Sequence, residues 1–296
     1  MPPQPQTATE IRTHLAENLS WRFAERDDQA VAQALYNGEA LDAVHTLEEV
    51  GLLDGFFAFL EASGVLAHWR TYTIAGIYRL FLPAIYFLLL YGTRILFGIA
   101  SSNALPELLF SNVAVMQLIG FNAHAVATGL TRRGAAQRSG ARPYVLMDPQ
   151  TLAQSICKTS AAELGRLFNG TIRCLAAWGI FPTSMLAAVD GTLIPTTNKY
   201  TGCGCLKVKQ YKRNRQGALV ETFELVYGWR LIVLIDLVTL IPVAFKIVQI
   251  QEHEAPHLRA LVQQAQKNLA PHSRIHTLVV DRAYVEDRVA ELAKSV

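Results

Sequence analysis

The chain has 296 residues, of which 51% are hydrophobic and 17% are charged, a balance that excludes a disordered chain and allows two folded domains. The formal net charge is +3, but residues 1–70 carry eleven acids and four bases, leaving 13 acids and 23 bases for residues 71–296. The later part of the chain is therefore the part expected to face a polyanion.

The first seventy residues are predicted to form a helical, acidic accessory region. Gln29–Tyr36 is rich in alanine and is followed by Asn37–Gly38, a pair that is typical of helix ends. Residues 1–8 lack the basic start and apolar run of a secretory signal. The four cysteines are therefore expected to be reduced thiols rather than disulfides.

Residues 74–100 form the most apolar stretch, and the mean hydropathy of +0.21 makes a membrane protein a rival interpretation. Arg79 and Arg94 leave only 14 uncharged residues between them, and Pro83 interrupts these. A membrane-spanning helix needs about 20 apolar residues. We therefore predict a buried core helix and no membrane partner, with a membrane-associated protein as the rival.

Arginines gather in a stretch rich in Gly, Ala and Ser, at Arg132, Arg133, Arg138 and Arg142. One interpretation is a solvated linker. The other is a DNA-binding loop, because arginines on a flexible backbone can neutralise phosphates without reading bases. Residues 71–182 are therefore predicted to be a helical region that binds DNA through this loop.

A helix is expected to begin at Asp148–Pro149, where an N-cap residue precedes proline at the first helical position. Apolar residues at helical spacing then give one helix, or a pair of helices, a buried face before Gly179 and Pro182: Leu152, Ile156, Leu164, Leu167, Ile172 and Leu175.

After Pro182 the pattern changes from helix to strand. We predict strands at Leu186–Val189, Tyr227–Asp236, Ile241–Ile250 and Ile275–Val280, with a helix starting at Pro256 before the last of them. The buried face of that helix is predicted to consist of Leu258, Leu261, Val262, Ala265 and Leu269. A three-stranded antiparallel meander, a helix and a fourth strand make up the first half of a ribonuclease-H-like fold. The fold prediction is therefore an α-helical N-terminal region followed, over residues 183–296, by a partial α/β ribonuclease-H-like domain.

Aspartates end the first and the last predicted strands, at Asp190 and Asp281. These strands are neighbours in such a sheet, so the two carboxylates are expected to share one cleft although they are 91 positions apart. Two carboxylates repel each other, and Mg²⁺ or Mn²⁺ would keep both ionised and could support phosphoryl transfer. The alternatives are a turn aspartate at Asp190 and an ion pair with Arg282 at Asp281.

Basic residues surround Tyr211 between the first two predicted strands, at Lys207, Lys209, Lys212, Arg213 and Arg215. We interpret them as a loop that overhangs the carboxylates and contacts DNA, with a solvated loop as the alternative. The turn Glu252–His253–Glu254 is open to two interpretations: His253 as a ligand of metal or DNA, or glutamates that cap the next helix.

The chain resembles bacterial insertion-sequence transposases of the Asp-Asp-Glu type over roughly residues 105–296. The resemblance rests on the order of several short segments: Gly120–His124, Gly129–Gly134, Val189–Thr192, Tyr227–Arg230, Glu252–Glu254 and Val279–Tyr284. It implies that Asp190 and Asp281 are the first two catalytic, metal-binding acids. It also implies double-stranded DNA as substrate, self-association, and a cytoplasmic, nucleoid-associated protein.

The third acid of that family has no counterpart here. Glu286, Asp287 and Glu291 follow Asp281 too closely, because at least one strand should intervene. We therefore expect a truncated transposase that binds metal weakly and cleaves DNA poorly or not at all. The alternative is a catalytically inactive DNA-binding remnant or regulator.

Overall fold

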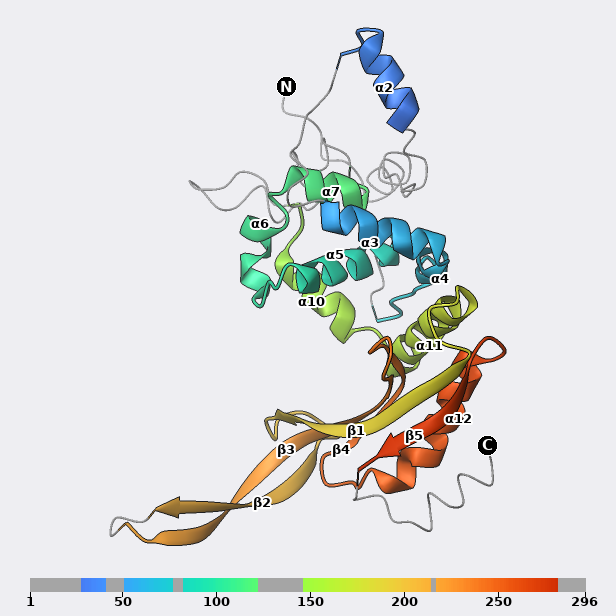
Figure 1. Cartoon of the computed structure of the whole chain (residues 1–296). Helices are drawn as coiled ribbons and strands as arrows, with labels where there is room; N and C mark the ends of the chain where they lie inside the picture. The colour runs from blue at the N-terminus through green and yellow to red at the C-terminus, as the bar shows by residue number, and fades with distance from the viewer. Residues whose placement is uncertain (1–27, 41–50, 77–81, 122–145, 214–216, 282–296) are drawn as a thin grey trace, which may run out of the picture. The chain divides into compact units, whose positions relative to one another are not determined.

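A computed structural model describes residues 28–40, 51–76, 82–121, 146–213 and 217–281 (Figure 1). The chain divides into two compact units, residues 1–171 and 172–296. The described residues combine helices with a mixed five-stranded sheet, which makes the chain an α/β protein. The three-part division at residues 70 and 182 stays a prediction.

Within the described residues, the regular secondary structure of the first unit consists of helices. Its elements are α2 (Asp28–Tyr36), α3 (Gly51–Ala62), α4 (Val65–Trp69), α5 (Ala84–Leu96), η2 (Ser102–Ala104), α6 (Leu105–Leu108), α7 (Val113–Ile119), α10 (Pro149–Cys157) and most of α11 (Ala161–Ala177). Helix α2 ends where Asn37–Gly38 predicted, because Gly38 adopts the left-handed conformation (φ 82°) that commonly follows a helix.

The apolar stretch contains the buried core helix that its length predicted. Helix α5 begins after Pro83, and five apolar side chains on it are buried together with Thr93: Ile85, Tyr86, Phe87, Leu89 and Leu90. The Tyr86 ring lies 4.8 Å from that of Phe121, and burial raises the pKa of the Tyr86 hydroxyl well above its ordinary value. Within the described ranges, no helix is both long and apolar enough to cross a membrane.

Helices α10 and α11 are the predicted helix pair. Asp148 caps α10 through its Oδ1, which accepts a hydrogen bond from the backbone N–H of Gln150 at 2.9 Å. Of the six residues predicted for their buried face, Leu152, Ile172 and Leu175 are buried. The other three are half-buried, namely Ile156, Leu164 and Leu167. The cysteines are free thiols, as expected.

Glu163 on α11 is held by several hydrogen bonds. Its Oε1 accepts the N–H of Thr73 at 2.9 Å, and Arg166 donates to both of its carboxylate oxygens, at 2.6 and 2.7 Å. The Arg166 hydrogen bonds in particular lower the pKa of Glu163 from its ordinary 4.5 to about 2.

Replacing Glu163 by glutamine is expected to reduce the free energy of unfolding by about 1 kcal/mol at neutral pH, a value kept low because Arg166 is well exposed. A lowered carboxyl pKa stabilises the fold above pH 4.5, and that contribution is lost as the pH falls toward 2. Urea unfolding near pH 6 and near pH 3 should therefore show a smaller gap between wild type and variant at the lower pH. An equal gap at both would contradict the assignment.

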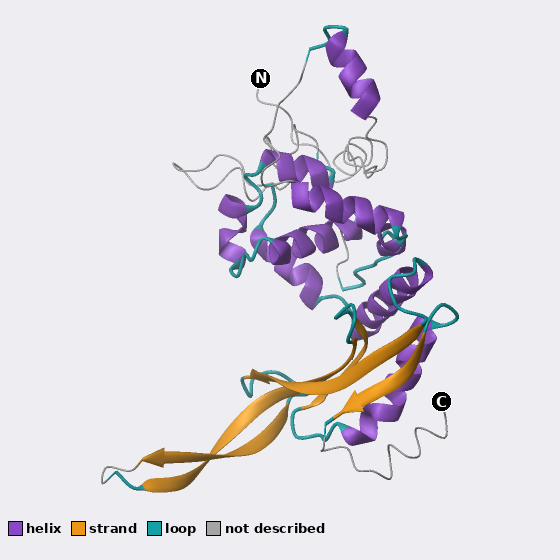
Figure 2. Cartoon of the chain, in the orientation of Figure 1, coloured by secondary structure: helices purple, strands orange, loops and turns teal. Residues whose placement is uncertain are grey.

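The second unit contains the sheet (Figure 2). Its strands are β1 (Ser184–Thr196), β2 (Gly204–Arg213), β3 (Leu219–Asp236), β4 (Pro242–Gln249) and β5 (Arg274–Val280). β1 lies between β3, its antiparallel partner, and β5, its parallel partner. On its other edge β3 pairs first with β2 and then with β4, both antiparallel. η3 (Ala255–His257) and α12 (Leu258–Leu269) connect β4 to β5.

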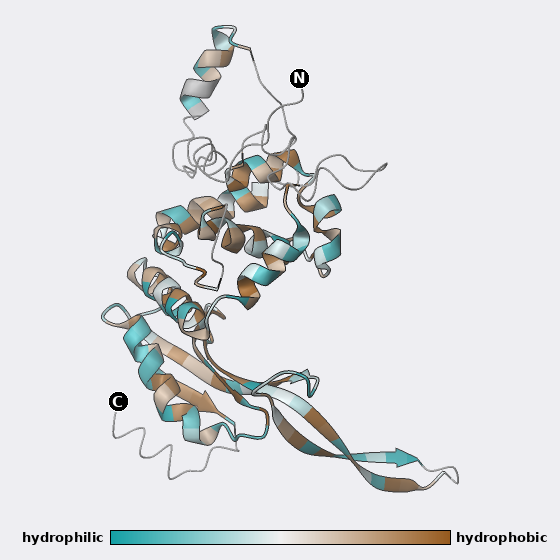
Figure 3. Ribbon diagram, turned by 180° about the vertical axis from the view of Figure 1, so that it is seen from behind, coloured by the Kyte–Doolittle hydropathy of each residue, from teal (hydrophilic) through white to brown (hydrophobic). Residues whose placement is uncertain are grey.

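The core of the second unit lies between the sheet and α12. All five residues predicted for the buried face of α12 are buried, and Figure 3 shows hydrophilic residues on its outer surface. Every second residue of β1 faces this core, namely Met185, Ala187 and Val189. Asn268 on α12 ties the helix to β4 by donating to the carbonyl of Val243 at 2.9 Å.

Three sheet predictions were wrong in detail. β1 runs on to Thr196 rather than ending at Asp190, and β3 begins at Leu219 rather than Tyr227. The segment Lys207–Arg213 is part of a strand and not a loop, because β2 pairs along its whole length with the first half of β3. Asp236 ends β3 at the turn to β4, where its Oδ2 accepts the N–H of Thr239 at 2.9 Å.

Candidate functional site

The strand register brings Asp190 and Asp281 to neighbouring positions. Val189 of β1 pairs with Val280, the last residue of β5, and each of these two valines is followed by an aspartate. Adjacent strands lie about 4.8 Å apart, which puts the two carboxylates within reach of one cation. The prediction that two acids 91 positions apart meet at one place in the sheet is thus supported by the pairing.

Asp190 projects from the sheet face opposite to α12. Side chains alternate along a strand, and Val189, which precedes it, is buried on the α12 side, whereas Asp190 is exposed. Its Oδ1 accepts the N–H of Gly191 at 2.8 Å, and Asp281 is also exposed. Two exposed carboxylates are the hard oxygen donors that Mg²⁺ and Mn²⁺ prefer.

No third acidic or histidine ligand joins this pair within the described residues, which contain no cluster of three or more His, Cys, Asp or Glu side chains suited to a metal. The described chain thus brings two protein ligands to the site. The remaining ligand positions of a hexacoordinate ion would be filled by water or by other groups.

The α12 side of β1 carries a packed ion pair that the sequence did not predict. Arg230 Nη1 donates to Glu254 Oε1 at 2.7 Å, and both side chains are largely buried. The Glu254 carboxylate lies directly over Gly191: a Cβ at residue 191 would stand 2.1 Å from Glu254 Oε1. Glycine is therefore required beside Asp190 for steric reasons, so that the ion pair can pack against β1.

The Glu252–Glu254 turn is anchored in a way that differs from the predicted helix cap. Glu254 makes no side-chain capping hydrogen bond, and its carboxylate binds Arg230 instead. Glu252 accepts the N–H of Gln249 at 3.0 Å and contacts His257 Nε2 at 3.1 Å. Lys246 Nζ lies 3.0 Å from the other ring nitrogen of His257, so His257 rather than His253 is the histidine held in a polar network.

Of the nine basic residues predicted to contact DNA, four lie in the described part of the chain and five lie outside it. Lys207, Lys209, Lys212 and Arg213 lie on β2 and are exposed. The others, Arg132, Arg133, Arg138, Arg142 and Arg215, lie outside the described residues.

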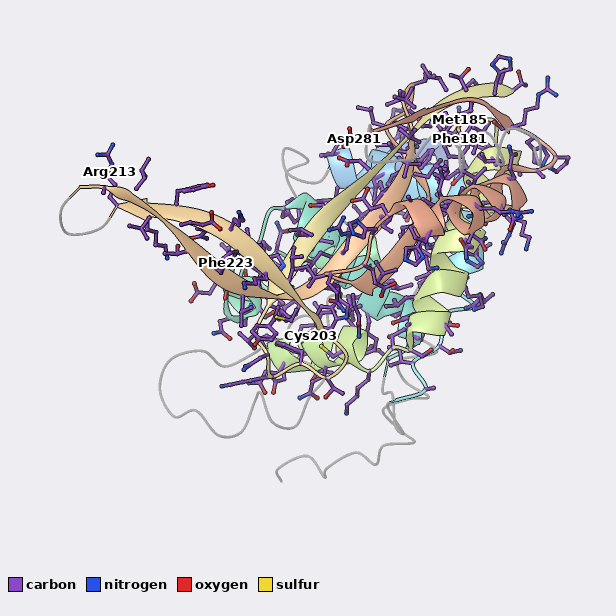
Figure 4. The ribbon with its side chains drawn as sticks, turned by 90° about the horizontal axis from the view of Figure 1, so that it is seen from below. Phe181, Met185, Cys203, Arg213, Phe223 and Asp281 are labelled. Carbon is purple, nitrogen blue, oxygen red and sulfur yellow. The ribbon has the colours of Figure 1, made fainter. Side chains whose placement is uncertain are left out.

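The prediction that this basic segment overhangs the carboxylates was wrong. Lys207 pairs with Leu225, whereas Asp190 pairs with Val233, eight residues further along β3. At about 3.3 Å per residue the two positions are separated by about 26 Å along the strand. Figure 4 likewise shows Arg213 well separated from Asp281.

No protein-family model, curated protein or solved structure matches the chain.

Proposed function

We propose that the chain is a DNA transposase of the Asp-Asp-Glu type, and that residues 172–296 form the first part of a ribonuclease-H-like catalytic domain. The observation that carries this proposal is the register in which Asp190 and Asp281 follow the paired residues Val189 and Val280. The strand order, with β1 between an antiparallel β3 and a parallel β5, and the helical connection from β4 to β5 support it.

In this proposal Asp190 and Asp281 hold Mg²⁺ or Mn²⁺ at the exposed sheet face. The bound cation would supply an activated water and stabilise charge on a scissile phosphate. The chain's own contribution is to fix the two carboxylates at one level of a rigid sheet. β3 and β5 hold β1 on both sides there, and α12 covers the opposite face. The exposed bases Lys207, Lys209 and Arg213 of β2 contact the DNA.

A second candidate is a DNA-binding protein without catalytic activity. The specific observation in its favour is that the described residues bring two acids to the site, whereas the family uses three. Glu254, a nearby acid in the fold, is held by Arg230 on the other face of β1 and so does not complete the set.

Manganese binding tests the site directly. Electron paramagnetic resonance of Mn²⁺ titrated into the full chain should show that Asp190→Asn and Asp281→Asn each weaken binding by at least about tenfold, or about 1.4 kcal/mol. Glu224→Gln removes an exposed carboxylate elsewhere on the sheet and should bind like wild type. Unchanged Mn²⁺ affinity in both aspartate variants would refute the metal site.

Cleavage of duplex DNA distinguishes the two candidate functions. A transposase should nick or cut DNA in the presence of Mn²⁺ and lose this activity in both aspartate variants. A non-catalytic protein should bind DNA with an affinity that does not depend on Asp190 or Asp281 and should leave the DNA intact.

A further inference from the structure

β2 and the first half of β3 form a two-stranded ribbon that extends beyond the rest of the sheet (Figures 1 and 2). Over residues 219–226, β3 has no pairing with β1, and β2 is an edge strand, so the ribbon has a partner strand on neither side among the described residues. Such a ribbon is marginally stable alone, which makes its two side-chain faces candidates for contact with another molecule.

The register divides the ribbon into two different faces. Cross-strand partners project to the same side, so all the odd-numbered residues share one face and all the even-numbered residues share the other. The odd face carries Lys207, Lys209, Tyr211, Arg213, Leu219, Glu221, Phe223 and Leu225. Along these strands it holds three cations and one anion, a net charge of +2. The even face has Lys212 and Glu224, which cancel.

Two contacts confirm that the odd residues act as one surface. Lys207 Nζ lies 4.0 Å from the centroid of the Phe223 ring, and Lys209 Nζ pairs with Glu221 at 2.9 Å. The large apolar side chains on this face are open to solvent, with Tyr211 64% and Phe223 51% exposed. Figure 3 shows hydrophilic residues along β2 beside hydrophobic ones on β3.

We propose that the odd face of this ribbon enters the major groove of double-stranded DNA. The proposal rests on the proposed function, which makes DNA the substrate, and it assigns the DNA contact to one face of the ribbon. The major groove is about 12 Å wide and admits a two-stranded ribbon. The cations of the odd face would meet phosphates. Exposed apolar groups on the same face, such as Phe223 and Leu225, suit thymine methyl groups. A second copy of the chain fits less well, because two odd faces of net charge +2 repel each other.

The length of the ribbon sets the distance between the proposed DNA contact and the carboxylates of Asp190 and Asp281. Arg213 pairs with Leu219, 14 residues from Val233, the partner of Asp190. At about 3.3 Å per residue, Lys207 and Arg213 lie about 26 and 46 Å from Asp190 along the strand, or about 8 to 14 base pairs of DNA. The ribbon would therefore hold the duplex about one helical turn away from the phosphate at the carboxylates.

Neighbouring residues on opposite faces provide a matched test. Arg213→Gln removes a charge from the odd face, and Lys212→Gln removes one from the even face. Fluorescence anisotropy of the full chain with a duplex of about 30 base pairs, in EDTA and over a range of salt concentrations, should give a log–log salt slope about 0.9 smaller for Arg213→Gln. Lys212→Gln should stay close to wild type. Equal slopes for the two variants would overturn the assignment to one face.

The groove is tested with the same duplex carrying glucosylated hydroxymethylcytosine, which fills the major groove. Wild-type affinity should fall to that of Arg213→Gln, and an unchanged affinity would overturn major-groove docking. The outcome is separable from the proposed function, because Asp190→Asn is expected to keep the ribbon's DNA contact and lose Mn²⁺. If Arg213→Gln changed the sedimentation coefficient and left DNA affinity intact, the face would bind a second copy and the DNA assignment would fall.

Discussion

Gly228→Ala is expected to lower the free energy of unfolding by about 3 kcal/mol, because the new Cβ would be forced against backbone. That Cβ would stand 2.2 Å from the carbonyl oxygen of Ile194 in β1, and backbone cannot swing aside as a side-chain end can. The φ of Gly228, 156°, is also one that other residues rarely adopt. Thermal unfolding followed by circular dichroism should show the midpoint falling by roughly 10 °C.

The position of Gly228 explains why this contact is so close. It pairs with Pro195 of β1 and with Gly204 of β2, at the point where β3 leaves β4 and continues into the ribbon. The control is Gly165→Ala in α11, where a Cβ meets nothing within 4 Å. That substitution should stabilise the protein by about 0.5–1 kcal/mol, since alanine favours helix. A similar change in both variants would show that the cost is not the contact with Ile194.

The spacing of apolar residues along the sequence was sufficient to predict α12 and β5 of the second unit. The five apolar residues of α12 recur every three or four positions, and the run Ile275–Val280 is continuous, so the helix and the last strand were predicted close to their observed bounds. The pairing of β1 with β5 followed from the order of the elements. That order was also what predicted the approach of Asp190 to Asp281.

β2 was predicted as a loop because its high density of basic residues was given more weight than its alternation of apolar and charged residues. Leu206 and Val208 alternate with Lys207 and Lys209, a period of two that is typical of a strand, but the density of bases favoured a loop. The packing of Glu254 over Gly191 had no comparable signal. The two residues are 63 positions apart, and only the tertiary fold places the β4–α12 turn against β1.

Gly191→Ala is the second substitution expected to have a large effect, and its mechanism differs from that at Gly228. The group in the way is a side-chain carboxylate, which can move, so the cost is the loss of its ion pair with Arg230 rather than a collision with backbone. Breaking a largely buried pair should cost about 2 kcal/mol in urea unfolding. Because Asp190 is the preceding residue, Mn²⁺ affinity should fall as well.

A double-mutant cycle with Glu254→Ala tests whether the cost of Gly191→Ala comes from the contact with Glu254 or from β1 not accepting a side chain at residue 191. Once the Glu254 carboxylate is gone, a methyl group at residue 191 has room, so Gly191→Ala should cost less than about 0.5 kcal/mol in that background. The coupling energy of about 1.5 kcal/mol would then belong to the packing of Glu254 on Gly191. If Gly191→Ala cost the same in both backgrounds, the glycine would be needed for some reason other than Glu254.

Recovery of Mn²⁺ affinity in the double variant would mean that displacement of Glu254 is what disturbs Asp190. Affinity lost in both backgrounds would place the disturbance in the β1 backbone itself.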